Sequence, residues 1–183
     1  GLSMSSRVGE NFSGNGDVLA FAYDCDEEIN GVGFGHRSPE GRQRVGPCIT
    51  GVIDMRKQPR LADSLVLEEG SIAGAFAAFL PKLFAAAAAL LGKDTDRGLQ
   101  DRANELKREF ESLTFGAYRG AVRNTQTMLA MSHDDAKGRL FLEDNRLRIS
   151  WPDVGTQPNV ARVNEKIEKA TAALGGTYLK NPL

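Results

Sequence analysis

Two adjacent carboxylates, Glu68 and Glu69, stand at the end of an apolar stretch. Alternating side chains predict a strand over Ser64–Glu69, and neighbouring side chains of a strand point to opposite faces of its sheet. Glu69 then shares a face with Leu65 and Leu67. If that face lines a cavity, loss of water raises the pKa of Glu69 and suits its carboxyl group to proton transfer. The alternative is that both carboxylates are solvated at a junction with a following helix, where negative charge is favourable.

The loop Ser13–Asp17 packs small residues around one amide side chain, Asn15. Gly14 and Gly16 permit positive φ angles, so the loop can turn its backbone N–H groups toward a ligand. Gly14, Asn15 and Gly16 are therefore candidates for contact with a ligand. A surface turn would have the same composition, and that alternative stays open at this level.

Several other chemistries find no support in the sequence. His36 and His133 are the only histidines and lie in different polar segments, and no cysteine has metal-ligand spacing to another ligand residue, so we expect no metal site. No Gly-x-Ser-x-Gly motif is present, which disfavours a serine hydrolase. The run Gly31–Gly35 neither follows an apolar strand nor opens a helix, so its glycines indicate a turn or bulge rather than a dinucleotide fingerprint. The chain alone is not expected to bind a flavin or a nicotinamide tightly.

Length and composition favour one domain. The chain has 183 residues, of which 41% are hydrophobic and 26% charged, and its net charge of −1 disfavours nucleic acid and anionic membranes as partners. Cys25 and Cys48 resemble buried thiols of a reducing compartment. Because Pro81 and Lys82 interrupt the apolar stretch Ala73–Leu91, we expect no membrane span. The N-terminus has no secretory signal, which indicates a cytoplasmic protein.

The first half of the chain predicts three strands and a helical region. Apolar and β-branched residues predict strands over Val18–Tyr23, Cys48–Met55 and Ser64–Glu69. The alanine-rich stretch Ile72–Leu91 favours helix, in one or two pieces because Pro81 should kink or divide it.

The second half predicts helix, strands and helix. Asp94 or Thr95 can cap an amphipathic helix, whose apolar residues recur at intervals of three and four: Leu99, Ala103, Leu106, Phe110 and Leu113. Short links favour an antiparallel meander of three strands, over Thr125–Met131, Arg139–Leu142 and Leu147–Trp151.

A last helix starts near Pro158 and ends at Gly175-Gly176. Together these elements predict an α+β fold, with a mostly antiparallel sheet of about five or six strands and helices packed on one face.

Several phrases of the chain, in their order and spacing, resemble the glucose–methanol–choline (GMC) oxidoreductase family. Within it, the resemblance is to the bacterial branch that includes cholesterol oxidase. It covers nearly the whole chain, and its phrases are residues 7–17, 30–35, 46–54 and 64–69 together with 146–151 and the helix that leads to 175–178.

This resemblance implies the middle part of a two-part flavoprotein. Members of the family bind FAD in a domain built from N-terminal and C-terminal segments, and the chain between them forms a sheet over the active site. Residues 1–11 would be a remnant or crossover from the FAD-binding domain, and residues 12–183 the substrate-binding domain. The FAD fingerprint and the segment with the family's catalytic histidine lie outside this sequence.

The resemblance also implies roles for individual residues. Glu69 stands where cholesterol oxidases have an active-site glutamate that assists proton movement, and Leu67 stands where they have an aromatic residue lining the cavity. Asn15, with Gly14 and Gly16, lies in the loop that approaches the flavin and substrate. Asn124 and Gln126 are candidates for the cavity wall, and so for substrate contact.

The intact protein would then oxidise an alcohol, with sterols among the substrates the branch suggests, by hydride transfer to FAD. The chain alone would be inactive, and its partner would be the FAD-binding domain of the same polypeptide. An alternative is a stand-alone domain that binds a small molecule or a partner without catalysis. Self-association of the isolated chain, through the face that would meet the flavin domain, is a further expectation.

Overall fold

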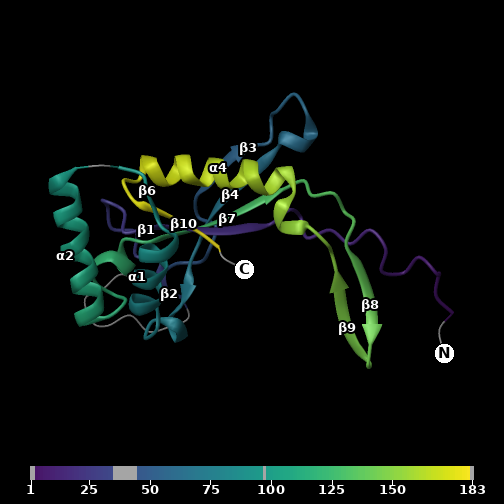
Figure 1. Cartoon of the computed structure of the whole chain (residues 1–183), viewed down its shortest axis with the longest axis horizontal. Coiled ribbons are helices and arrows are strands. Elements are labelled where there is room, and N and C mark those ends of the chain that lie inside the picture. The colour runs from purple at the N-terminus through teal and green to yellow at the C-terminus, as the bar shows by residue number, and fades with distance from the viewer. Residues whose placement is uncertain (1–2, 35–44, 97, 182–183) are drawn as a thin grey trace.

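The structure, a computed structural model, describes residues 3–34, 45–96 and 98–181. Its centre is a six-stranded antiparallel sheet with the strand order β3-β4-β7-β1-β10-β6. In that order the strands are Val52–Met55, Leu65–Gly70, Gln126–Ser132, Val18–Tyr23, Thr177–Lys180 and Lys93–Asp94. The α+β class and the antiparallel sheet agree with the sequence-based prediction (Figure 1).

Helix α4 (Pro158–Ala173) covers one face of the sheet. Its apolar stripe, which includes Val163 and Ile167, packs against Ala20 and Ala22 of β1, and all four side chains are fully buried. Alanines in the central strand let the helix approach the sheet closely, because a small side chain leaves room for the larger ones that face it. The helix was predicted from this spacing, and Pro158 starts it as expected.

The other face carries a second helical layer at the β1–β10 end only. Phe84 of helix α1 (Leu80–Leu91) and Val122 of helix α3 (Gly120–Arg123) belong to a core cluster with Tyr23. Helix α2 (Leu99–Phe115) packs mainly on α3. Helices therefore occupy both faces rather than one, because both sets of alternating β1 side chains are apolar and each needs a cover.

Helices α1 and α2 begin at other residues than the sequence-based prediction gave. Pro81 lies in the first turn of α1, where its missing N–H costs nothing, so the helix begins at Leu80 and not at Ile72. Residues Ile72–Ala73 instead form β5, which pairs in parallel with β2 (Val32–Phe34). Asp94 pairs with β10 as part of β6, so it does not cap α2.

Strands β8 (Arg139–Glu143) and β9 (Arg146–Ser150) form a separate hairpin. The predicted meander with β7 is therefore wrong, because β7 has both of its edges occupied, by β1 and β4. Asp144 and Asn145 both have positive φ and make the tight turn. The hairpin extends from the same side of the sheet as α1, leaving part of the sheet between them (Figure 1).

Of the helices in the described ranges, none has both the length and the apolar character that a membrane crossing requires.

Candidate functional site

The half of the sheet that α1 and α3 leave uncovered presents a mixed apolar and acidic surface, which we name the open face. By strand register it carries the side chains that alternate with the α4-side core. Leu19 is 37% exposed and Val52 is 51% exposed, so no layer built from the described residues seals this surface. Its residues are Asp17, Leu19, Val52, Asp54, Val66, Glu68, Leu129 and Met131.

Three carboxylates lie on the open face, and one of them, Asp54 of β3, forms an ion pair with Arg56. Asp17 precedes β1, and Glu68 lies in β4, which is separated from β1 by β7. The pKa of Asp17 is raised by partial burial and by the negative charges of Glu68 and Asp134. Asp17 can therefore hold a proton more readily than a solvated aspartate.

The loop Ser13–Asp17 is held by the carboxylate of Asp134, which follows β7. Asp134 Oδ2 accepts hydrogen bonds from Ser13 Oγ, from Gly14 N and from Gly16 N, each at 2.9 Å. Its Oδ1 accepts one from the Ala136 N–H, also at 2.9 Å. Burial alone would raise the pKa of Asp134, but these hydrogen bonds outweigh it and the pKa is lowered. The Gly14 and Gly16 N–H groups, which were candidates for cofactor contact, are thus satisfied inside the chain.

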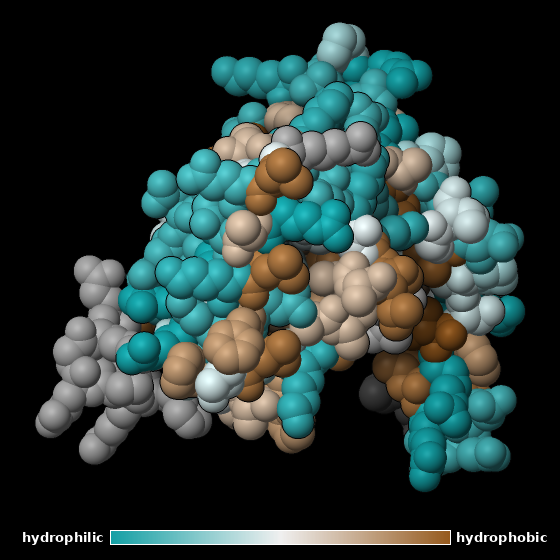
Figure 2. Space-filling view, turned by 60° about the vertical axis from the view of Figure 1, so that its left-hand side comes forward, coloured by the Kyte–Doolittle hydropathy of each residue, from teal (hydrophilic) through white to brown (hydrophobic). Residues whose placement is uncertain are grey.

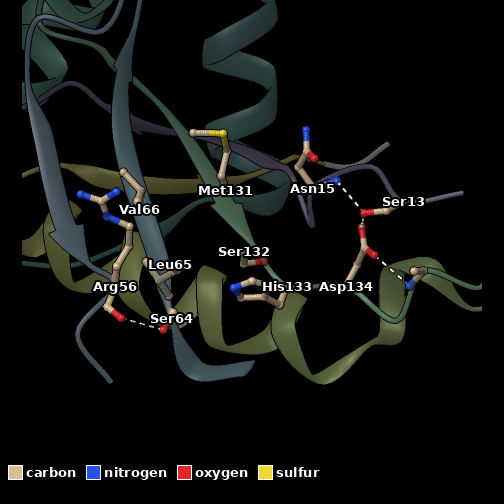
Figure 3. A pocket seen from close by; sticks show the side chains of 11 residues that line it. Ser13, Asn15, Arg56, Ser64, Leu65, Val66, Met131, Ser132, His133 and Asp134 are labelled. Carbon is tan, nitrogen blue, oxygen red and sulfur yellow. Dashed lines mark hydrogen bonds between the residues drawn. The ribbon is translucent and has the colours of Figure 1, made fainter. Parts of the chain in front are cut away.

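Beside this loop is a cavity of about 450 Å³, which we name the end cavity (Figure 3). Ser13 and Asp134 point toward each other at its rim, and Asn15 and His133 contribute an exposed amide and an exposed imidazole. Within the described part of the chain, neither of those two side chains forms a hydrogen bond. They are free to bind a polar ligand. The remaining lining comes from Arg56, Ser64, Leu65, Val66, Met131, Ser132 and Ala136.

A second cavity, of about 410 Å³, lies at the opposite end of β4, and we name it the edge cavity. Glu69 and Gln126, both sequence-predicted site residues, line it together. Glu69 Oε2 accepts a hydrogen bond from Thr50 Oγ1 at 2.5 Å, and Gln126 Nε2 donates to its neighbour's carbonyl oxygen at 2.7 Å. The register puts both side chains on the α4 side of the sheet and not on the open face.

The sequence-predicted residues therefore fall into two places. Glu69 lies opposite Met128 of β7, whereas the Asn15 carbonyl accepts a hydrogen bond from Ser132 at the other end of that strand. Four strand residues span about 13 Å. One small substrate cannot touch Asn15 and Glu69 at the same time, so the set predicted from the sequence does not form a single site.

Two further sequence-predicted residues have structural positions. Leu67 is 3% exposed and packs in the α4-side core, so it does not line either cavity. Asn124 Nδ2 donates to the carbonyl oxygen of Cys25 at 2.7 Å and ties the end of β1 to α3. Leu67 is thus packed in the core, whereas Asn124 lines another cavity, of about 480 Å³, on the α3 side. Substrate contact by either side chain stays a prediction.

The sequence-based reasoning missed the open-face role of Glu68 and the anchoring role of Asp134. The signal for Glu68 was the alternation itself. Leu65 and Leu67 are apolar and alternate along the strand, so their side of the strand faces the core. Glu68 alternates with them and therefore points to the other face. Asp134 had no local signal, because its partners are about 120 residues away in the chain.

Four carboxylates gather between β6 and α2: Asp94, Asp96, Asp101 and Glu105 offer oxygens that all lie within 4.8 Å of one another. Burial, followed by the charges of Asp101 and Asp94, raises the pKa of Glu105 to about 7. Carboxylates on a surface often gather in this way without a metal ion, so we assign no metal to them.

This cluster predicts a pH dependence of stability. A carboxyl group whose pKa is higher in the folded chain contributes stability below its unfolded-state pKa, and this is lost as the pH rises through the folded-state pKa. The melting temperature should therefore fall between about pH 4.5 and about pH 7, by a few degrees. Calorimetric scans across this range should show a smaller fall for Glu105→Gln, whereas the control Glu143→Gln on the hairpin should follow the unmodified chain. Equal curves for all three would contradict the prediction.

We compared the chain with protein-family models, with curated proteins and with solved structures, and found no match in any of the three.

Proposed function

We propose that this domain is the substrate-binding part of an FAD-dependent alcohol oxidoreductase of GMC type. The observation that carries the proposal is the open face. An antiparallel sheet normally buries at least one face and solvates the other with polar residues, yet here the uncovered region holds Leu19, Val52, Leu129 and Met131. A surface of this kind could form one wall of a binding site for an apolar alcohol.

The surroundings of the open face support contact with a second domain. The β8–β9 hairpin stands away from the body, and it exposes several apolar side chains. Monomeric proteins seldom leave such residues grouped on a projecting element without a partner. They are Phe141 (38% exposed), Leu142 (71%), Leu147 (65%) and Ile149 (56%).

In this proposal the described residues leave the flavin to a second domain. A pyrophosphate needs unpaired backbone N–H groups, and those of Gly14 and Gly16 already donate to Asp134. In the proposal a separate FAD-binding domain holds the cofactor, and this domain closes over it. When bound there, FAD would supply the hydride acceptor for the oxidation of the alcohol.

The residues of this chain would bind and orient the alcohol. Leu19, Leu129 and Met131 contact its apolar part and exclude water from the reacting carbon. Glu68, with Asp17 nearby, provides a carboxylate on the open face that can accept a hydrogen bond from the hydroxyl group. The base that removes the hydroxyl proton belongs to the other domain.

The complete gene product that contains this chain tests the proposal. Purified protein should show flavin absorbance and should oxidise at least one member of a broad panel of primary, secondary and sterol alcohols. The 183-residue chain alone should do neither. Purification of the complete product without flavin, or flavin-loaded product inactive on the whole panel, would refute the proposal.

In that complete product, Glu68→Gln should lower kcat by up to about a hundredfold, the lower end of the range for a general acid or base, because the base itself belongs to the other domain. Glu69→Gln is the matched control, because the two residues are adjacent and Glu69 points to the α4 side. Steady-state kinetics over a pH series would measure kcat for both variants. A fall in kcat for Glu69→Gln with an unchanged rate for Glu68→Gln would instead support the role that the family resemblance implies for Glu69.

A second candidate function is a stand-alone small-molecule-binding domain. The end cavity favours it, because its lining comes entirely from this chain and offers Asn15 and His133 as unpaired polar groups. Asn15→Ala should then abolish ligand binding by the isolated chain, which the oxidoreductase proposal does not require.

A further inference from the structure

Helix α2 leaves its apolar side uncovered. Leu99 is 94% exposed, Leu106 is 62%, Phe110 is 66% and Leu113 is 47%. Figure 2, which brings the α2 end of the molecule forward, shows hydrophobic side chains following one another down this side, with hydrophilic residues beside them. These side chains, together with Ala103, make what we name the α2 stripe.

The α2 stripe has the spacing of a coiled-coil seam. Its residues alternate intervals of four and three, so Ala103 and Phe110 take the a positions of a heptad and Leu99, Leu106 and Leu113 take the d positions. A helix that packs on a globular core usually has a wider apolar stripe. The narrow a/d seam is typical of one helix packing along another.

The opposite side of α2 already attaches the helix to its own domain. Arg108 forms an ion pair with Asp24, and Ser112, 1% exposed, accepts a hydrogen bond from the Val122 N–H. Arg108 and Ser112 occupy f and c positions, which face away from the a/d seam. The α2 stripe therefore cannot turn inward without breaking these contacts.

We propose that the α2 stripe is a homodimer interface, in which α2 packs antiparallel against α2 of a second copy of this chain. A two-fold axis relates the copies, so every contact occurs twice. Ala103 packs against Leu106 of the second copy, and Leu99 packs against Phe110 of the second copy. The small Ala103 then faces the larger Leu106 at the centre of the seam, which lets these two layers interlock.

The charges beside the α2 stripe select this arrangement. In an antiparallel pair, g positions face g positions and e positions face e positions. The layers described above bring Arg102 (g) next to Glu109 (g) of the second copy, and bring Gln100 (e) next to Lys107 (e) of the second copy. Within the ranges that the structure describes, Arg102, Lys107 and Glu109 form no ion pair, so their charges are available to a partner.

Neighbouring arrangements place like charges together. A shift by one heptad in one direction brings Glu109 next to Glu109 of the second copy and Lys107 next to Lys107 of the second copy. The opposite shift brings Arg102 next to Arg102 of the second copy. A parallel pair would place Arg102 (g) beside Lys107 (e) of the second copy. Each alternative is repulsive, and the antiparallel register is the one with opposite charges in contact.

The proposal is independent of flavin chemistry, and the 183-residue chain itself can test it. Sedimentation velocity and light scattering under reducing conditions, from about 1 to about 100 μM protein, cover the Kd range of small interfaces. The chain should shift from monomer to dimer over this range. Leu106→Glu should weaken association at least about tenfold, because the dimer would bury the new charge at the centre of the seam. Leu142→Glu, on the exposed hairpin, is the control and should leave association unchanged.

A monomer at every concentration, or equal weakening by Leu106→Glu and Leu142→Glu, would overturn the proposal. Both positions are exposed in the single chain, so both variants should keep the circular dichroism spectrum of the unmodified chain.

Charge reversal tests the orientation. Arg102→Glu should weaken the dimer by repulsion from Glu109 of the second copy, and the double variant Arg102→Glu with Glu109→Arg should restore it. In a parallel dimer Arg102→Glu would instead strengthen association by pairing with Lys107 of the second copy. Strengthening by that single change, or failure of the double variant to recover, would overturn the antiparallel arrangement.

Discussion

Replacing Arg108 by Met is expected to lower the free energy of unfolding by about 3–5 kcal/mol, because removal of one partner leaves a buried charge uncompensated. The side chain of Asp24 is 3% exposed and that of Arg108 is 16% exposed. The Arg108 guanidinium donates to Asp24 Oδ1 and, at 3.0 Å, to the Asp24 carbonyl oxygen. Urea denaturation followed by circular dichroism measures the loss.

The double variant Asp24→Asn with Arg108→Met should recover part of this loss, since it removes the unpaired charge and keeps the side-chain shape. Asn also tolerates the positive φ of 56° at position 24. Burial raises the pKa of Asp24 to about 7, and the hydrogen bond and charge of Arg108 oppose this rise. Without Arg108 the carboxyl group is protonated more readily, so Arg108→Met should be less destabilised near about pH 5 than near about pH 8. An equal loss at both pH values would contradict this explanation.

Replacing Asp134 by Ala is expected to cost about 2–4 kcal/mol of unfolding free energy, since it removes the acceptor for Ser13 Oγ and for three backbone N–H groups. Gly16 is buried, so its N–H would have little water to bind in place of the carboxylate. The backbone amide signals of Gly14 and Gly16 should shift more in a ¹H–¹⁵N spectrum than those of the β8–β9 hairpin.

Asp134→Asn is the matched control. It keeps one oxygen acceptor and should cost less than the change to Ala. Because the hydrogen bonds lower the pKa of Asp134, its contribution is present above the unfolded-state pKa of 3.8 and is lost as the pH falls through the folded-state value. Chemical denaturation at neutral pH and below pH 4 compares these states. Equal stabilities of the Ala and Asn variants at neutral pH would show that the hydrogen bonds to Asp134 do not hold the loop.

The elements with a strong periodic pattern were predictable from the sequence. Apolar and β-branched residues predicted β1, short links predicted β7, and a helical stripe predicted α4, because each of these elements packs on the core through a regular set of apolar residues. Strand β10 was missed, since it is only four residues long, too short to show a period. The α2 stripe was found by its spacing, but its exposure was not predictable, because periodicity reports which side is apolar and not what covers it.

The candidate site was harder to predict for a similar reason. Adjacent glutamates must lie on opposite faces of β4, and the sequence could not say which face helix α4 would occupy. Once α4 covers Leu65 and Leu67, Glu68 belongs to the open face. The end cavity depends on contacts between Asp134 and a loop far away in the chain, which no local pattern encodes.

The strand order has a consequence for how the chain is made. Strand β1 ends at Tyr23, but its neighbours β7 and β10 begin at Gln126 and Thr177. At a synthesis rate of about 5–20 residues per second, β1 waits roughly 5–20 s before its first neighbour exists, and longer for its second. During that time its apolar side chains and both backbone edges are exposed to other nascent chains and to chaperones. The strand at the centre of the finished sheet is the first to be synthesised and is paired on both edges only when the last strand has been made.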